Sequence, residues 1–528
     1  MEAECLPFSQ LPGTSRLFLD YVRGKVSAPF YPAIDQLPSQ PRKDFPDDRR
    51  KKIGEILATQ SRQFGASAKT LANIEKLRAD ASAVVTGQQV TLFGGPAFAI
   101  YKALTAITVA EQLSKRGIES VPIFWLATQD HDFAEVQGAL LRSPAGEYRS
   151  FSLQTTTAPA DSPVGKIKLG TQIGALAHEA AEFVGGEQAA LLRDCYQAEE
   201  TLGSAMGRLF AKIFANRGLI VMDPLHPELQ RLAAPLYQEV VKKRDGLDRS
   251  LLERGKELEA AGYHQQVKVT PSSTLLFLEL DGTRTPLRRV NGNFAAGEKR
   301  YSEPQLIEHI NKSPETISGN ALLRPVVQDY LLPTVAYVGG PAEVAYFAQA
   351  AVIYEKLLKQ VTPIIPRLSA TVLDARDQRL LAEYGLRVRD VMEQGAKLGE
   401  FLAARKLNSD VEKAFATAGS VFEEQIGSLE KQLKQFDPTL ADAAKHSRSK
   451  IEYQLSRLRG RAANALLRRN QELRRHAEAL HKSLFPNREL QERQIAGISY
   501  LARFGEDLLT RLESAARSGC NGHHVVRM

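Results

Sequence analysis

The sequence contains few cysteines and no long apolar run. Its 528 residues include three cysteines, Cys5, Cys195 and Cys520, which lie far apart in the chain. So sparse and odd a set excludes a disulfide scaffold and is typical of a reducing cytosol. No stretch approaches the roughly 18 consecutive apolar residues that cross a bilayer, and residues 1–12 lack the basic start and apolar segment of a secretory signal. These absences predict a soluble, cytoplasmic protein.

The composition is otherwise that of an ordinary globular protein. Hydrophobic residues make up 43% of the chain and charged residues 25%, which excludes a disordered or collagen-like chain. At roughly 100–200 residues per domain, the length predicts two or three domains. The nucleotidyl-transferring synthetase signatures H-x-G-H and K-M-S-K-S are absent.

The net charge of +8 is concentrated in one segment. Residues 440–518 contain 16 Lys+Arg and 9 Asp+Glu, whereas the rest of the chain contains 53 and 52. Two interpretations stay open: a basic arm that binds RNA or DNA, or a solvated helical face that also dimerises. Acidic residues alternate with the basic ones and few aromatic residues are interleaved for base stacking, so the pattern favours the solvated face.

This segment carries the heptad spacing of a coiled coil. The seam consists of apolar residues at alternating spacings of four and three, namely Ile451, Leu455, Leu458, Ala462 and Ala465. An amphipathic stretch over 411–436 precedes it and another helix is expected over 490–516, with breaks at Asp437-Pro438 and Pro486-Asn487. The spacing predicts a helical coiled-coil arm over 381–517, followed by a tail over 518–528.

The first 380 residues have a different pattern. Short apolar runs at 82–86, 121–127, 219–223, 334–338 and 363–366 predict strands, and 97–113 and 342–358 predict helices. Strands that alternate with helices predict an α/β fold with a doubly wound parallel sheet of Rossmann type, and a site at the carboxyl ends of the strands.

Two segments interrupt this alternation. A small hairpin followed by helix is expected within 146–170, and 275–280 with 284–290 form an antiparallel meander whose turns are Asp281-Gly282 and Asn291-Gly292. We interpret them as insertions near 146–205 and 240–320 that cap the ligand crevice.

A matched pair of glycine turns lies within the sheet-forming region. The pattern G-G-P-A-x3-Y-x-A occurs at Gly94-Gly95 and again at Gly339-Gly340. Glycines allow close backbone approach, and a proline at the first helical position leaves N–H groups facing an anion. The turns therefore indicate either a carboxylate or phosphate site or two tight turns without a ligand. Neither matches G-x-G-x-x-G or G-x4-G-K-[ST], which excludes ordinary dinucleotide and P-loop sites.

Polar residues gather at the same predicted edge. Asp130, His131 and Asp132 follow the second strand and could supply a base with its orienting carboxylate or metal ligands, although helix capping explains an Asp there equally well. Alternation puts His131 on the opposite side from the two carboxylates, so joint ligation of a metal is not expected. Lys102 and Arg324 suit carboxylate or phosphate binding. Cys520, His523 and His524 lack a fourth ligand, so no metal site is predicted.

Several long motifs resemble the BshC family. They are V-T-G-Q-Q-V-T-L-F-G-G-P at 85–96, Y-K-A-L-T-A at 101–106, F-W-L-A-T-Q-D-H-D-F at 124–133, R-P-V-V-Q-D-Y-L-L-P at 324–333, Y-V-G-G-P-A-E-V-A-Y at 337–346 and F-P-N-R-E-L-Q-E-R at 485–493. The resemblance covers nearly the whole chain. It implies a Rossmann-like core with connecting-peptide insertions, a coiled-coil arm and a homodimer. It also implies a cysteine ligase that joins L-cysteine to glucosaminyl-malate in bacillithiol synthesis. The family commonly has Glu before D-H-D, where this chain has Gln129.

Together these observations give a candidate site for amide formation. The expected catalytic residues are Asp130, His131 and Asp132. The expected substrate-binding residues are Thr86, Gln88, Gln89, Gly94, Gly95, Lys102, Arg324, Gln328, Asp329, Gly339, Gly340 and Glu343. No cysteine lies in the motifs, so a covalent cysteine intermediate is not expected. ATP with Mg²⁺ is suspected from the reaction type alone. The alternatives are a nucleic-acid-binding protein that uses the basic arm and a scaffold without catalysis.

Overall fold

The computed structural model describes residues 4–26, 29–32, 38–42, 44–154, 159 and 161–528. Its contacts divide the chain into two units. The first unit comprises residues 1–372, 492–526 and 528, and the second comprises residues 373–491 and 527. Among the described residues, no helix is both long and apolar enough to span a membrane.

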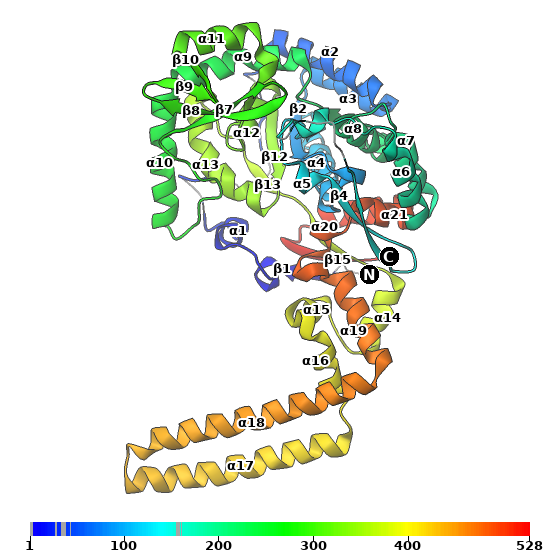
Figure 1. Cartoon of the computed structure of the whole chain (residues 1–528), viewed down its shortest axis with the longest axis vertical. Helices are drawn as coiled ribbons and strands as arrows, with labels where there is room; N and C mark the ends of the chain where they lie inside the picture. Colours follow the sequence, from blue (N-terminus) through cyan, green and yellow to red (C-terminus); the bar gives the residue numbers. More distant parts are fainter. Residues whose placement is uncertain (1–3, 27–28, 33–37, 43, 155–158, 160) are drawn as a thin grey trace. The chain divides into compact units, whose positions relative to one another are not determined.

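A five-stranded parallel sheet forms the centre of the first unit (Figure 1). Its strands are β2 (Ser82–Gln88), β3 (Ser120–Leu126), β6 (Ile220–Met222), β12 (Thr334–Gly339) and β13 (Ile364–Pro366). They lie in the order β13-β12-β2-β3-β6, and every neighbouring pair is parallel. The predicted doubly wound Rossmann-type sheet is confirmed.

The strands are apolar on both faces because helices cover both. Every residue of β3 and β12 is buried, and α4 (Phe98–Lys115) and α13 (Pro341–Leu357) follow β2 and β12. The chain extends the sheet from β2 first toward β6 and later toward β13. The point where this direction reverses lies between β2 and β12, and ligands bind at such a switch point in open α/β sheets.

The first insertion lies between β3 and β6. It holds an antiparallel hairpin of β4 (Gly138–Arg142) and β5 (Tyr148–Ser152), then α6 (Gln172–Val184), α7 (Ala190–Cys195) and α8 (Leu202–Ile213). The hairpin starts earlier than the sequence predicted, and residues 155–158 and 160 of the predicted range lie outside the described residues.

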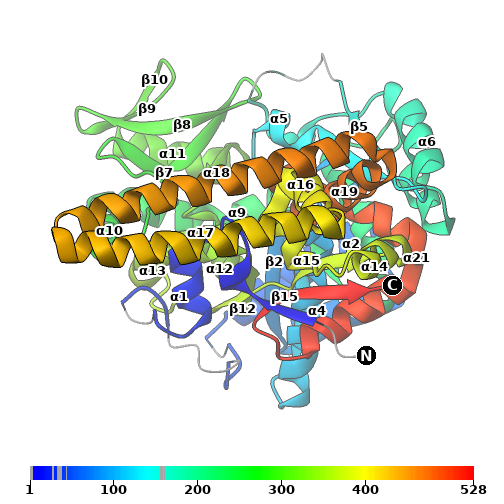
Figure 2. The ribbon, with the colours of Figure 1, turned by 90° about the horizontal axis from the view of Figure 1, so that it is seen from below.

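The second insertion lies between β6 and β12 and contains the predicted meander. Strands β7 (Ser273–Leu280), β8 (Thr283–Val290), β9 (Asn293–Ala296) and β10 (Lys299–Tyr301) pair in succession, and β11 (Ile317–Gly319) joins the other side of β7. Its predicted turns are present, with Asp281 at φ 50° and Asn291 at φ 48°. Figure 2 shows this second sheet beside α11.

The remaining helices of the first unit surround these elements. They are α1 (Arg16–Val22), α2 (Asp47–Gln63), α3 (Ala68–Ala79), α5 (Phe133–Val136), α9 (Pro227–Lys242), α10 (Arg244–Ala260), α11 (Glu303–Lys312), α12 (Arg324–Leu331), α20 (Gln491–Gln494) and α21 (Gly497–Arg517).

The two ends of the chain meet in a third sheet. Strand β15 (Gly522–Arg527) lies between β1 (Glu4–Pro7) and β14 (Ser369–Leu373). Antiparallel pairing of β1 with β15 brings Cys5 and Cys520 into a disulfide, with Cα atoms 6.3 Å apart. The sparse cysteine pattern did not predict this bond, because strand pairing joins residues that are 515 positions apart in the sequence. Cys195 is free and buried.

The second unit is helical, as predicted. Short helices α14 (Ala375–Glu383), α15 (Val388–Gln394) and α16 (Leu398–Arg405) precede the long pair α17 (Ser409–Phe436) and α18 (Leu440–Arg469), and α19 (Gln471–Leu484) follows. The long pair forms a helical hairpin in both views (Figures 1 and 2). Its connection falls at the predicted Asp437-Pro438 break.

Ion pairs join the two long helices of this arm. Arg448 of α18 contacts Glu423 of α17 and also Glu452 of its own helix, and Arg459 of α18 contacts Glu412 of α17 at 2.9 Å. The basic side chains are therefore partly neutralised by acidic neighbours. The seam residues Ile451 and Leu458 are exposed at 41% and 54%, so packing of α17 on α18 does not bury the predicted heptad seam.

Two boundaries differ from the sequence-based ones. Asn470 separates α18 from α19, where it accepts a hydrogen bond from the Leu473 N–H as an N-cap. The helix expected over 490–516 is present as α21, but its contacts place it with the first unit, where it packs on α4. The apolar face of α21 explains this placement, because it covers the parallel-sheet core rather than continuing the coiled coil.

Candidate active site

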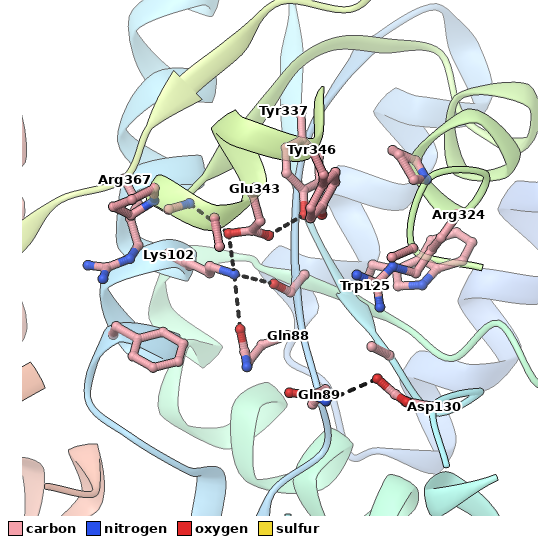
Figure 3. Close-up of a pocket in the computed structure, with 18 of the residues that line it drawn as sticks. Gln88, Gln89, Lys102, Trp125, Asp130, Arg324, Tyr337, Glu343, Tyr346 and Arg367 are labelled. Carbon is pink, nitrogen blue, oxygen red and sulfur yellow. Dashed lines mark hydrogen bonds and ion pairs between the residues drawn. The ribbon is translucent and has the colours of Figure 1, made fainter. Parts of the chain in front are cut away.

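A cavity of about 470 Å³ opens at the carboxyl ends of β2 and β12, at the switch point of the sheet. Eight of the predicted residues line it: Gln88, Gln89, Lys102, Asp130, Arg324, Gln328, Gly340 and Glu343. Figure 3 shows several of them converging from separate elements. Parallel strands bring their carboxyl ends to one edge, so residues far apart in sequence share this cavity. We call it the first cavity.

Lys102 is held entirely by the protein. Its Nζ lies 2.8 Å from the Gly87 carbonyl oxygen, 3.0 Å from Gln88 Oε1 and 2.7 Å from Glu343 Oε2. An ammonium group has three N–H donors, so these three acceptors use them all. Lys102 is only 4% exposed. Its charge is paired with Glu343, and no N–H of the ammonium group is left to bind a ligand.

Glu343 also closes the second glycine turn. Its Oε2 accepts from the Gly340 N–H at 2.6 Å, and its Oε1 accepts from the Tyr337 hydroxyl at 2.7 Å. Burial opposes ionisation, but the charge of Lys102 and the Gly340 N–H lower the pKa of Glu343. The network continues from Tyr337 to Tyr346, which shares a hydrogen bond with Arg324.

Two further carboxylates, Asp130 and Glu135, line the cavity. The Gln89 amide nitrogen donates to Asp130 Oδ2 at 3.0 Å and to Glu135 Oε2 at 2.8 Å. Burial opposes ionisation of Asp130, but the His131 N–H and the charge of Arg324 outweigh it and lower the pKa of this carboxyl. Asp130 is therefore an anion at neutral pH and accepts hydrogen bonds there.

Several lining residues were missed by the sequence reasoning. They are Arg367, which directly follows β13, the aromatic residues Trp125, Tyr337 and Tyr346, and Glu135. Arg367 follows the run 363–366 just as Gln88 ends the first strand. The rule that polar residues at strand ends form the site could therefore have found it.

A second cavity of about 380 Å³ adjoins the first. The two share six lining residues: Trp125, Ala127, Asp130, Val267, Ala321 and Arg324. His131 lines only the second cavity, where its Nδ1 lies 3.0 Å from Arg284 Nη1. Burial lowers the pKa of Arg284 to about 10. Gln129 also lines this second cavity. The expectation that Asp130 and Asp132 share one side with His131 opposite is wrong: Asp130 and His131 both line this second cavity, with His131 Nδ1 3.6 Å from Asp130 Oδ1, and Asp132 lines neither cavity. The strict alternation fails because the chain turns after β3 instead of staying extended.

Asp132 caps a helix instead of facing either cavity. Its Oδ1 accepts from the Glu135 N–H at 3.1 Å at the start of α5. Thr86 bonds the Val338 carbonyl oxygen at 2.9 Å between β2 and β12. Asp329 is buried beneath the site, where Tyr354 donates to it at 2.8 Å. These three predicted residues lie among the side chains that support the cavity.

The two glycine turns are not equivalent in structure. Gly94 and Gly95 both have positive φ, and the Gly94 N–H donates to the Tyr196 hydroxyl at 3.0 Å. Gly340 is extended at φ −87°, with Pro341 at the first helical position. Gly94, Gly95 and Gly339 lie outside the lining of both cavities. The N–H groups of Gly94 and Gly340 already have protein acceptors, so these turns do not form an anion cradle.

The tail does not form a metal site in the structure. Cys520 is in the disulfide, and His523 contacts Ser369 and Thr371. Across the residues that the structure describes, no group of three or more His, Cys, Asp and Glu side chains is placed to hold a metal ion.

Comparison with known proteins gives two family matches that together span the chain. Residues 1–368 match the N-terminal Rossmann-like domain of bacillithiol biosynthesis BshC, and residues 370–528 match its C-terminal coiled-coil domain. The chain belongs to the BshC family. Three similar relatives share the name "Putative cysteine ligase BshC".

These BshC relatives align over nearly their whole length. The protein of Koribacter versatilis is 40% identical, and that of Solibacter usitatus 35% identical, each over 100% of both chains. The protein of Salinibacter ruber is 31% identical over 97% of this chain and 96% of its own. In this member of the BshC family, the C-terminal match includes residues 492–526, which belong with the Rossmann-like unit.

Proposed function

We propose that this protein is a ligase that joins the carboxyl group of L-cysteine to the amine of glucosaminyl-malate, forming the amide of bacillithiol. The names of the BshC relatives supply the substrate class. The observation that carries the proposal is a cavity lined by both carboxylates and guanidinium groups, among them Asp130, Glu135, Arg324 and Arg367. Both substrates present an amine together with carboxylates, so a lining with charges of both signs fits them.

The carboxylates and the guanidinium groups have separate tasks in this proposal. Asp130 and Glu135, joined by Gln89, receive the sugar amine and accept the proton that its nitrogen loses as the C–N bond forms. Arg324 and Arg367 receive substrate carboxylates. Holding both reactants at one sheet edge lowers the entropic cost of their encounter.

Amide formation from a free carboxylate also requires an activated acyl group. ATP with Mg²⁺ would provide one, but the glycine turns do not fit its phosphates, because the Gly94 and Gly340 N–H groups are already bonded. We therefore assign no step of this reaction to a nucleotide bound at these turns.

The decisive experiment is turnover with L-cysteine and glucosaminyl-malate, with and without ATP and Mg²⁺, with bacillithiol measured by mass spectrometry. Asp130→Asn should reduce the rate at least about 100-fold, in the range that positioned acid–base groups contribute. Asp132→Asn is the matched control because asparagine also caps helices well, and it should keep the rate of the unmodified enzyme. An inactive unmodified enzyme under every condition would refute the reaction, and equal rates for the two variants would refute the site.

We also propose that the arm pairs with the arm of a second copy. The supporting observation is a set of exposed apolar side chains on α17 and α18: Val411, Val421, Leu429, Phe436, Ile451, Tyr453 and Leu458. Exposed apolar surface on a soluble protein, where it is contiguous, marks an interaction site. Light scattering should give twice the 58.2 kDa chain mass, and Ile451→Glu with Leu458→Glu should give the monomer. A monomeric unmodified protein would refute the pairing.

A further inference from the structure

The first cavity is connected to the C-terminal strand through one buried carboxylate. Glu492 on α20 is fully buried and contacts Arg367, whose Nη2 lies 2.7 Å from Glu492 Oε1. The same Oε1 lies 3.0 Å from Ser369 Oγ, and Oε2 accepts from the Ala370 N–H at 2.6 Å. Burial opposes ionisation, but the charge of Arg367 lowers the pKa of Glu492. Glu492 is therefore an anion that can only accept hydrogen bonds.

His523 on β15 lies directly behind this carboxylate. Its Nδ1 is 2.8 Å from Ser369 Oγ, and its Nε2 is 2.8 Å from Thr371 Oγ1. Burial lowers the pKa of His523 to about 4, so the ring is neutral at pH 7 and has one donor and one acceptor nitrogen.

The acceptor character of Glu492 sets the direction of every bond in this cluster. The Ser369 hydroxyl must donate to the carboxylate, so it can only accept from His523. The imidazole proton is therefore on Nδ1, and Nε2 accepts from the Thr371 hydroxyl. If the proton were on Nε2, Ser369 would have to donate to both Nδ1 and Glu492 with a single hydrogen. The cluster thus has one consistent arrangement, with all donors directed toward Glu492.

Arg367 is the end of this cluster that faces the first cavity. Its Nη1 donates to the Leu368 carbonyl oxygen at 2.7 Å and its Nη2 to Glu492, which uses two of the five guanidinium N–H groups. The guanidinium also lies over the Phe98 ring at 5.1 Å. Lys102 has no donor left, so Arg367 and Arg324 are the better placed of these three cations to bind an anion.

We infer that Arg367 binds an anionic group of the substrate, and that His523 is a positioning residue that acts on Arg367 through Ser369 and Glu492. This inference rests on the proposed ligase function for the identity of the substrate. The shared chemistry is a carboxylate or phosphate, which either the malyl group or a nucleotide could supply. The C-terminal strand, far from the cavity in sequence, would then be part of the substrate-binding apparatus.

The first test is spectroscopic and uses the unmodified protein. Nitrogen chemical shifts of ¹⁵N-labelled histidines, with His523 assigned from His523→Asn, should show a protonated Nδ1 and a bare Nε2. Addition of glucosaminyl-malate should shift this signal, since Arg367 and Glu492 link the ring to the cavity. A proton on Nε2, or a ring that titrates near pH 6.5, would overturn the positioning role.

The second test measures binding by calorimetry and turnover on matched variants. Ser369→Ala breaks the link between His523 and Glu492 and should weaken binding about tenfold, since it removes one bond to a charged group. His523→Leu should do the same, while His523→Asn should recover most of the affinity because its amide nitrogen can still donate to Ser369. His524→Gln is the control: its residue neighbours His523 on β15, is 3% exposed and points to the other face of the strand. It should bind as the unmodified protein does.

Arg367→Lys identifies the anion. Weaker binding of glucosaminyl-malate with unchanged ATP binding assigns the malyl carboxylates, and the reverse assigns a nucleotide phosphate. Unchanged binding of both overturns the role of Arg367. If Ser369→Ala and His524→Gln lose the same amount of binding affinity, the role of His523 is overturned. If Arg367→Lys weakens substrate binding but the unmodified protein shows no turnover, this inference stands and the proposed reaction is refuted. If the enzyme turns over and Arg367→Lys changes neither binding nor rate, the reaction stands and this inference is refuted.

Discussion

Charges in the Rossmann-like unit and in the arm occupy opposite environments. The side chains of Arg367 and Glu492 are 5% and 0% exposed, whereas those of Arg459 and Glu412 on the arm are 45% and 36% exposed. The arm carries most of the net positive charge, but water screens its charges and its ion pairs are weak. The Rossmann-like unit is nearly neutral overall, but it contains buried charges such as Arg367 and Glu492, and a buried charge without a partner is strongly destabilising. The location of a charge, more than the count of charges, indicates where recognition takes place.

The largest expected effect comes from breaking the Lys102–Glu343 pair. Glu343→Ala leaves a buried ammonium without its carboxylate, so we expect the free energy of unfolding to fall by about 3–5 kcal/mol. Urea unfolding can be followed by the fluorescence of Trp125, the one tryptophan of the chain, which is buried on β3. The double variant Lys102→Met with Glu343→Leu is the control and should lose much less. Equal losses would show that packing, rather than charge, governs this site.

The second prediction concerns pH and His523. Burial lowers the pKa of His523 from 6.5 to about 4, so the unfolded chain binds a proton that the folded chain rejects between these values. The resulting stability is complete above pH 6.5 and is lost as pH falls toward 4, by about 3 kcal/mol. Unfolding of the unmodified protein and of His523→Asn, compared between pH 7 and pH 4.5, should give a flatter pH dependence for the variant. Parallel curves would contradict this assignment.

The third prediction concerns the disulfide that joins the chain ends. Cys520→Ser should lower the stability of the first unit by about 2 kcal/mol under oxidising conditions, because the unfolded chain regains freedom. Dithiothreitol should bring the unmodified protein to the level of the variant and should leave Cys520→Ser itself unchanged. Cys195→Ser, the control that keeps the Cys5–Cys520 bond, should respond to dithiothreitol as the unmodified protein does. No difference between oxidised and reduced protein would show that β1 and β15 pair without help from the bond.

The smallest effect is expected on the arm. Glu412→Ala removes the partner of an exposed Arg459, and the helical signal at 222 nm should show a loss below about 1 kcal/mol. High salt should reduce this difference further, since it screens exposed charges. A loss as large as that of Glu343→Ala would remove the contrast between the two regions.

Most of the fold could be predicted from local sequence patterns. The buried runs 82–86 and 121–127 became β2 and β3, and the turn dipeptide Asp281-Gly282 was found where expected. The exception is the helix over 490–516, whose pattern predicts a helix but not its partner. Periodicity reveals that a face is apolar, whereas the surface that covers it depends on the rest of the chain.

The candidate site could be predicted only in part, for the same reason. Strand ends pointed to Gln88 and Asp130, and the charge of Arg324 pointed to anion binding; all three line one cavity. The assignment of Lys102 as a ligand-binding cation needs revision, because only the folded structure shows that three acceptors saturate it. The resemblance between the two glycine turns likewise concealed different backbone conformations.

The sequence by itself determined the parallel sheet, the helical arm and the location of the net charge, because each follows from patterns within a few turns of helix or a single strand. Tertiary structure alone decided that Cys5 forms a disulfide with Cys520 and that Glu492, which follows the arm in the sequence, binds Arg367. It also decided that His523 contacts Ser369 beside this pair. These contacts join residues that are far apart in the sequence and form only when distant segments pack together in the core. A local pattern of side chains therefore does not predict them.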